Sequence, residues 1–115
     1  MTITGALENL KKSAYSLEYY DSSWELDYMK ELEGDDSVSK WTKNHGIGIP
    51  YFDAESKLRT YKPDFLVEKT DGTIDLVEMT GRHLLKNPDK IKKMEFAKKW
   101  CEARGMKYRI VSEYQ

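Results

Sequence analysis

The chain has 115 residues, of which 39% are hydrophobic and 34% are charged, and its formal net charge is −1. This length and balance are typical of one folded domain, and they exclude an intrinsically disordered chain. The near-neutral charge argues against a protein that coats nucleic acid non-specifically, because such proteins are usually basic overall.

The cysteine count and the lack of long apolar runs indicate the cellular compartment in which the protein is expected. Cys101 is the single cysteine, which excludes an intrachain disulfide and a cysteine cluster for zinc. No run approaches the roughly 20 apolar residues of a membrane span, and the first 15 residues lack the apolar segment of a secretory signal. We therefore expect a cytoplasmic protein with no membrane association.

Charge is distributed unevenly along the chain. Residues 1–36 contain three lysines and nine acidic residues, a formal charge of −6. Residues 82–109 contain ten basic and three acidic residues, a formal charge of +7. This asymmetry is compatible either with ordinary solvated helix faces or with a surface that contacts phosphate groups.

The first 36 residues predict helices. Apolar residues at helical spacing indicate a short helix within residues 1–20, which we interpret as an N-terminal extension of a domain over residues 21–115. A stronger helix begins at a cap on Ser22 or Ser23 and ends at Gly34. Its apolar face includes one acidic residue, Glu25, in the first turn.

The rest of the chain predicts strands around one more helix. Strands are expected over residues 38–42, 46–53, 57–68, 74–79 and 106–113. Asp71 and Gly72 mark a hairpin turn between the third and fourth of these strands. A helix over residues 87–105 has Asn87 as its cap and leads into the last strand, which can then lie parallel to a central strand. The order predicts an α/β domain with a mixed sheet flanked by helices.

The predicted hairpin places two acidic residues opposite each other. Asp64 and Glu78 lie at about equal distances from the turn, so they should face each other within about one or two residue pairs. Two adjacent carboxylates repel unless a cation lies between them. Oxygen ligands of this kind suit Mg²⁺ or Mn²⁺, which activate water and neutralise charge in phosphodiester hydrolysis. The alternative is two surface acids with no common role.

The segment "YKPDFLVEKTDGTIDLVEMTG" resembles the signature of the PD-(D/E)XK nuclease superfamily. Together with "SSWE", "VSKW", "IPY" and "WCEARGMKYRIV", it resembles head-completion nucleases of tailed phages, endonuclease subunits of heteromeric transposases and type III restriction nuclease domains. The resemblance covers about residues 20–113 and implies a restriction-endonuclease-like fold.

The resemblance implies roles for particular residues. Glu25, Asp64 and Glu78 match the acidic positions, and the carbonyl of Met79 would be a further metal ligand. Thr80 stands where the superfamily has its lysine, and Asp21 stands where the phage members have a basic residue. Both departures remove positive charge from the expected site.

A lysine on the helix over residues 87–105 can replace the missing charge. Lys93 and Lys90 both fall within its apolar arc, and a lysine there needs a carboxylate partner or a route to water. We prefer Lys93, with Lys90 second. Alternatively, both amines face water and only their stems pack. Two further alternatives are that the Thr80 hydroxyl orients a water, or that catalysis is lost.

The sequence therefore predicts a Mg²⁺- or Mn²⁺-dependent DNA endonuclease related to phages or mobile elements. Arg82, Lys86 and Lys92 are expected to contact the DNA backbone. A homodimer or a larger phage, transposase or restriction assembly is the expected partner for double-strand cutting, in the host cytoplasm or the virion if the protein is viral. The rivals are a catalytically silent DNA-binding or head-assembly protein with the same fold, and an unrelated α/β interaction module.

Overall fold

A computed structural model describes residues 4–112 of the chain. The strands are β1 (Gly5–Glu8), β2 (Leu17–Tyr20), β3 (Val38–Thr42), β4 (Ile49–Phe52), β5 (Leu58–Tyr61), β6 (Phe65–Lys69), β7 (Ile74–Met79) and β8 (Lys107–Val111). The helices are α1 (Ser23–Gly34), α2 (Pro88–Glu102) and the short 3-10 helix η1 (Arg82–Leu84). Within residues 4–112, no helix combines the length and the apolar character that crossing a bilayer requires.

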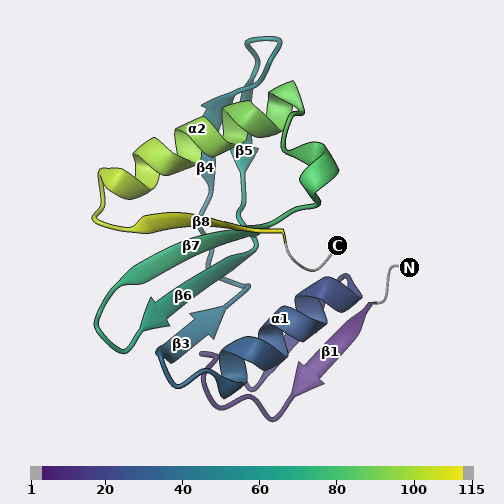
Figure 1. The fold of residues 1–115 in the computed structure, drawn as a ribbon, viewed down its shortest axis with the longest axis vertical. Helices are drawn as coiled ribbons and strands as arrows, with labels where there is room; N and C mark the ends of the chain where they lie inside the picture. Colours follow the sequence, from purple (N-terminus) through teal and green to yellow (C-terminus); the bar gives the residue numbers. More distant parts are fainter. Residues whose placement is uncertain (1–3, 113–115) are drawn as a thin grey trace.

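The central sheet has the strand order β3-β6-β7-β8. β6 and β7 form the predicted antiparallel hairpin, and β8 runs parallel to β7 after the connection through α2. The predictions of an α/β fold, a mixed sheet and a parallel last strand are therefore confirmed. Figure 1 shows α1 on one side of this sheet and α2 on the other.

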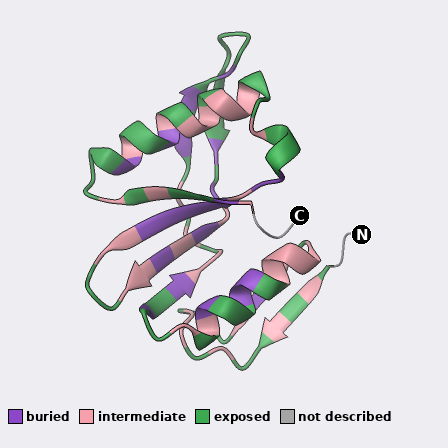
Figure 2. Ribbon diagram, in the orientation of Figure 1, coloured by how far each residue is buried: buried purple, intermediate pink, exposed green. Residues whose placement is uncertain are grey.

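Each face of the sheet has its own hydrophobic core. On the α1 face, buried residues of α1 such as Met29 pack with Trp41, Phe65 and Val77. On the α2 face, Ala97 and Cys101 of α2 pack with Leu76 and with the β4–β5 hairpin. Successive residues of β7 alternate between the two cores, as the period of two in a strand requires. Figure 2 shows the buried residues concentrated where the layers meet.

The predicted N-terminal helix is wrong. Residues 5–20 contain the antiparallel pair β1–β2, and Leu7, Leu10 and Tyr20 pack against the α1-side core. The spacing of the apolar residues is compatible with a helix, but Asn9 adopts a φ of 60°, which ends regular structure after β1. The division of the chain at residue 21 stays a prediction.

Four other boundaries differ from those predicted. The expected strand over 106–113 is limited to β8, and residue 113 lies outside the described residues. The expected strand over 57–68 is two strands, β5 and β6, because Pro63 has no N–H to donate to a ladder. The expected strand over 46–53 is limited to β4. Helix α2 ends at Glu102, three residues before Gly105, whose φ of 70° reverses the chain into β8. The predicted caps are confirmed at Ser22 and Asn87.

The turn between β6 and β7 depends on a glycine. Gly72 has a φ of 90°, and a Cβ there would meet nothing within 4 Å, so the cost of a side chain is backbone strain alone. We predict that Gly72→Ala lowers the free energy of unfolding by about 1–2 kcal/mol in chemical denaturation. Gly34→Ala is the matched control, because Gly34 has equally open surroundings and is not in the left-handed region. Equal stability of the two variants would contradict this account.

Candidate active site at the end of β7

Asp64 lies in the break between β5 and β6. Its backbone N–H donates to the carbonyl of Val77 over 3.0 Å, which continues the β6–β7 pairing by one residue. Its Oδ2 accepts a hydrogen bond of 2.8 Å from the N–H of Met79. The Asp64 carboxylate is therefore held against the end of β7.

Glu78 is near the end of β7 and is 6% exposed. It alternates with Val77, which faces the α1-side core, so its side chain lies on the α2 side. Its Oε1 accepts a hydrogen bond of 2.7 Å from the Tyr61 hydroxyl, and its Oε2 contacts Lys90 Nζ at 2.9 Å. Both carboxylate oxygens are thus fixed by protein donors.

Asp64 and Glu78 are close enough to influence each other strongly. Burial is the largest cause that raises the pKa of Asp64, to about 7, and the negative charge of Glu78 is the next. The N–H of Met79 opposes the increase, and the charge of Glu25 adds to it. At neutral pH the pair therefore carries unfavourable electrostatic energy, which a bound cation would relieve.

Glu25 approaches from the first turn of α1. The Ser22 hydroxyl accepts the Glu25 N–H at 3.2 Å, which fixes the start of the helix. Glu25 Oε1 accepts a hydrogen bond of 2.9 Å from the Asp21 N–H and forms an ion pair with Lys43. Lys43, at the end of β3, therefore neutralises the acid that the sequence assigns to the metal.

The structure places the two candidate lysines differently. Lys90 Nζ reaches Glu78, and the Lys90 side chain is 17% exposed. Lys93 Nζ instead lies 3.8 Å from Asp89 and 5.6 Å from the centre of the Tyr61 ring. Lys90, the second choice from the sequence, is the one that occupies the carboxylate site.

Thr80 follows Glu78 by two residues. It is 4% exposed, and its N–H donates to the Val111 carbonyl at 3.0 Å. Its buried Oγ1 has no hydrogen-bond partner among the described residues. A buried hydroxyl without a partner is costly, so Thr80 is an exception to the usual pairing of buried polar atoms.

Three residues that contact the site residues were not predicted from the sequence to do so. They are Lys43, Tyr61 and His45. The His45 Nδ1 accepts the Ile47 N–H at 2.9 Å, so Nε2 carries the proton and donates to the Pro63 carbonyl at 2.6 Å. His45 thereby holds the peptide that precedes Asp64. In the sequence, the only feature at this position is Pro63, directly before Asp64, and the Pro63 carbonyl is the one that His45 binds.

Asp64 and Glu78 supply hard oxygen donors that fit a small divalent cation, and Mg²⁺ needs only one or two carboxylates because it keeps several waters. Within residues 4–112, no group of three or more His, Cys, Asp and Glu side chains is arranged to hold a metal. Glu25 is paired with Lys43, as Glu78 is with Lys90, so these ion pairs do not decide which acids bind a metal. The predicted places of Glu25 and of the Met79 carbonyl among the ligands stay predictions.

The residues predicted to contact DNA lie beyond the end of β7. Arg82 is in η1, Lys86 follows it, and Lys92 is on α2, and all three side chains are exposed. Their exposure leaves them accessible to a phosphate backbone, and their contact with DNA stays a prediction.

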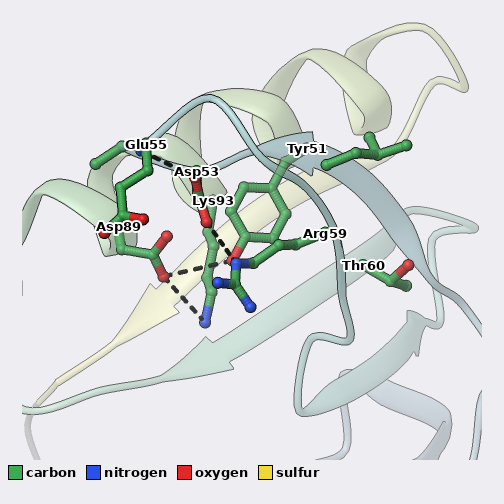
Figure 3. Close-up of a pocket in the computed structure, with 9 residues that line it drawn as sticks. Tyr51, Asp53, Glu55, Arg59, Thr60, Asp89 and Lys93 are labelled. Carbon is green, nitrogen blue, oxygen red and sulfur yellow. Dashed lines mark hydrogen bonds and ion pairs between the residues drawn. The ribbon is translucent and has the colours of Figure 1, made fainter.

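A cavity of about 700 Å³ lies between the β4–β5 hairpin and the start of α2. Figure 3 shows two ion pairs among its lining residues, Arg59 with Asp53 and Lys93 with Asp89, which also contacts Tyr51. Glu55 pairs with Lys57, outside the lining. Asp53 also accepts the N–H groups of the hairpin loop, so its role is to close that loop. We therefore assign the chemistry to the carboxylates at the end of β7.

The raised pKa of Asp64 gives a prediction about stability without metal. Its folded pKa exceeds its ordinary value of 3.8, so its favourable contribution is complete below pH 4 and is lost as the pH rises through 7. Asp64→Asn should therefore stabilise the protein in EDTA at pH 8 by about 1–2 kcal/mol, and the gain should vanish near pH 4. Thermal unfolding at several pH values measures this.

Asp71→Asn is the control, because the pKa of Asp71 is lowered by the fold whereas that of Asp64 is raised. The Thr73 N–H and hydroxyl lower the pKa of Asp71, so its charge is favourable in the fold. This variant should not gain stability at pH 8. A loss of stability in Asp64→Asn at pH 8 would show that the carboxylate pair is not strained.

Comparison with known families agrees with this geometry. Residues 35–113, more than two-thirds of the chain, match the family model described as TnsA-like endonuclease N terminal. No match is found among curated proteins. The match spans β3 to β8 and both acids of the β6–β7 hairpin, and it confirms the resemblance to transposase endonuclease subunits. The chain belongs to the TnsA-like endonuclease N-terminal family, within the restriction-endonuclease-like PD-(D/E)XK superfamily.

Proposed function

We propose that the protein is a DNA endonuclease that hydrolyses phosphodiester bonds with the help of Mg²⁺ or Mn²⁺. The observation that carries this proposal is the convergence of Asp64, Glu78 and Lys90 at the end of β7. Two carboxylates and one ammonium group are the residue types that hold a divalent metal and stabilise charge on a phosphate.

Asp64 and Glu78, with the Met79 carbonyl, would hold the metal. When bound, the metal lowers the pKa of a water molecule and neutralises charge on the scissile phosphate. The protein orients these ligands through a second layer of contacts. Tyr61 donates to Glu78 and itself contacts the Tyr108 hydroxyl at 2.9 Å, and burial raises the pKa of Tyr61, so it stays a donor at neutral pH.

Lys90 supplies the positive charge that Thr80 lacks. Its ammonium group is already beside Glu78, so it can orient the attacking water or bind an oxygen of the phosphate as negative charge develops. The Thr80 hydroxyl, on the same strand and without a partner among the described residues, can hold a water molecule at the site. Glu25 is the third acid of the proposed set, and its ion pair with Lys43 would have to open before Glu25 could join the metal ligands.

DNA is the proposed substrate, and the exposed cations Arg82, Lys86 and Lys92 support it. They follow the β7 strand or lie on α2, close in sequence to Lys90. Contacts from such residues to phosphates position a duplex without reading its sequence. Association with a second copy or with a larger transposase-like assembly, and a link to phages, remain part of the proposal.

A second candidate function is DNA binding without cleavage. The observation that favours it is the Lys43–Glu25 ion pair, which occupies one of the three expected acids, together with Thr80 at the lysine position. A protein of this kind would keep the fold and the basic surface for DNA-end binding or head assembly. The cleavage experiment below separates the two candidates.

Nicking of supercoiled plasmid tests the proposed function. The parent protein should nick in Mg²⁺ or Mn²⁺ and not in EDTA, and Asp64→Ala should reduce the rate at least about 100-fold, because one of two metal ligands is lost. Asp71→Ala, on the same hairpin but at its turn, should keep the rate. Absence of nicking by the parent protein, with DNA binding retained, would favour the non-cleaving candidate.

The assignment of the lysine is tested by comparing three positions on α2. Lys90→Ala should reduce the nicking rate about 100-fold because the ammonium group beside Glu78 is lost. Lys93→Ala should have a smaller effect, and Lys98→Ala, which removes an exposed lysine, should have almost none. Circular dichroism checks that each variant is folded. A larger loss in Lys93→Ala than in Lys90→Ala would reverse the assignment.

A further inference from the structure

The β1–β2 hairpin precedes the part of the chain that matches the family model, which begins at residue 35. In β2, Glu18 and Tyr20 point inward, and Tyr20 packs against the α1-side core. Tyr19 points outward and is 71% exposed, and Tyr15, just before β2, is 46% exposed. Two exposed tyrosines so close together are unusual, because aromatic side chains are normally buried for most of their area.

These tyrosines line a cavity of about 470 Å³ between the hairpin and the end of β3. Its lining residues are Tyr15, Leu17, Glu18, Tyr19, Lys43 and Asn44. The hairpin is tied to β3 at this place, because Glu18 accepts hydrogen bonds from the Ser13 hydroxyl and from the Lys43 N–H. The cavity is therefore a fixed feature between two elements.

Lys43 connects this cavity with the candidate active site. Its ammonium group is paired with Glu25, whose charge contributes to raising the pKa of Asp64. It also lies 5.9 Å from the centre of the Phe65 ring, which is next to Asp64 in the chain. Thr42, the residue before Lys43, pairs with Leu66 near the start of β6, so the cavity lies toward the same end of the sheet as Asp64.

We propose that this cavity receives an unpaired base of the DNA substrate, next to the scissile phosphate. This inference rests on the proposed function. The base would stack on Tyr19 and Tyr15, the Asn44 amide would lie at its edge, and Lys43 would face the connecting phosphate. Stacking requires an accessible base face, which a paired base inside a duplex does not offer.

The apolar part of the lining favours a base over a phosphate as the occupant. The Glu18 carboxylate points inward and is bonded to the Ser13 hydroxyl and the Lys43 N–H, so it does not face the occupant. The apolar surfaces of the tyrosines and Leu17 suit the flat face of a base. The protein would therefore prefer DNA with a frayed end, a flap or a single-stranded segment at the cut site.

Binding of a fluorescent base analogue tests the proposal without relying on cleavage. The Asp64→Asn protein is mixed, in EDTA, with a duplex that carries 2-aminopurine at one unpaired end position, and with a fully paired duplex of the same sequence. Stacking on tyrosine should change the fluorescence only for the unpaired base. Tyr19→Ala should weaken binding of the unpaired substrate about 10-fold and leave the paired substrate unchanged, whereas Tyr19→Phe should keep the binding.

Leu58→Ala is the matched control, because Leu58 is 68% exposed and lies on the β4–β5 hairpin. It should bind both substrates like the parent protein. Equal binding of unpaired DNA by Tyr19→Ala and the parent protein would overturn the proposal. So would a change in oligomeric state in Tyr19→Ala with no change in DNA preference, because the tyrosines would then form a protein interface. Failure of plasmid nicking would refute the proposed cleavage alone, since the fluorescence is read on uncut DNA.

Discussion

The repulsion between Asp64 and Glu78 is the constraint on which the site depends. The β6–β7 ladder and the turn at Gly72 place these carboxylates at one end of the sheet, where burial raises the pKa of Asp64. A fold has no stability reason to bring two acids together in this way. A cation between them changes the sign of the interaction, and that is the physical reason for treating the pair as a metal site.

The surrounding residues hold the pair in place and only partly compensate its charge. Lys90 and Tyr61 each donate a hydrogen bond to one oxygen of Glu78, and the N–H of Met79 donates one to an oxygen of Asp64. His45 fixes the Pro63 carbonyl immediately before Asp64. These contacts come from α2, β5, β7 and the loop after β3, so the site is assembled from several separate elements of the fold. Such support is what keeps ligands oriented before a metal or a substrate arrives.

The sequence was sufficient to predict the central hairpin, because its signals are local. Asp71-Gly72 sets the turn, and the distances from the turn to Asp64 and Glu78 set their register. The sequence was not sufficient to choose between Lys90 and Lys93. Helical periodicity gives the face of α2 on which both lie, but only packing gives the position of the helix along the strand, and a shift of three residues decides which lysine reaches Glu78.

Long-range contacts account for the other differences. Ten of the first 20 residues are hydrophobic, but their spacing does not distinguish a helix from a hairpin that packs on a distant core. The ion pair between Lys43 and Glu25 joins residues 18 positions apart, one directly after β3 and the other in α1, and no local sequence pattern indicates it. The same contact gives Glu25 a cationic partner, and its place among the metal ligands stays a prediction.

The most direct test of this account is the thermal unfolding of the parent protein and Asp64→Asn at pH 8, with EDTA and then with excess Mg²⁺ or Mn²⁺. We expect the metal to raise the unfolding temperature of the parent protein, because it removes the repulsion between Asp64 and Glu78, and to have little effect on the variant. No metal-induced change in the parent protein, or an equal change in both proteins, would contradict the central claim that this carboxylate pair is a cation site.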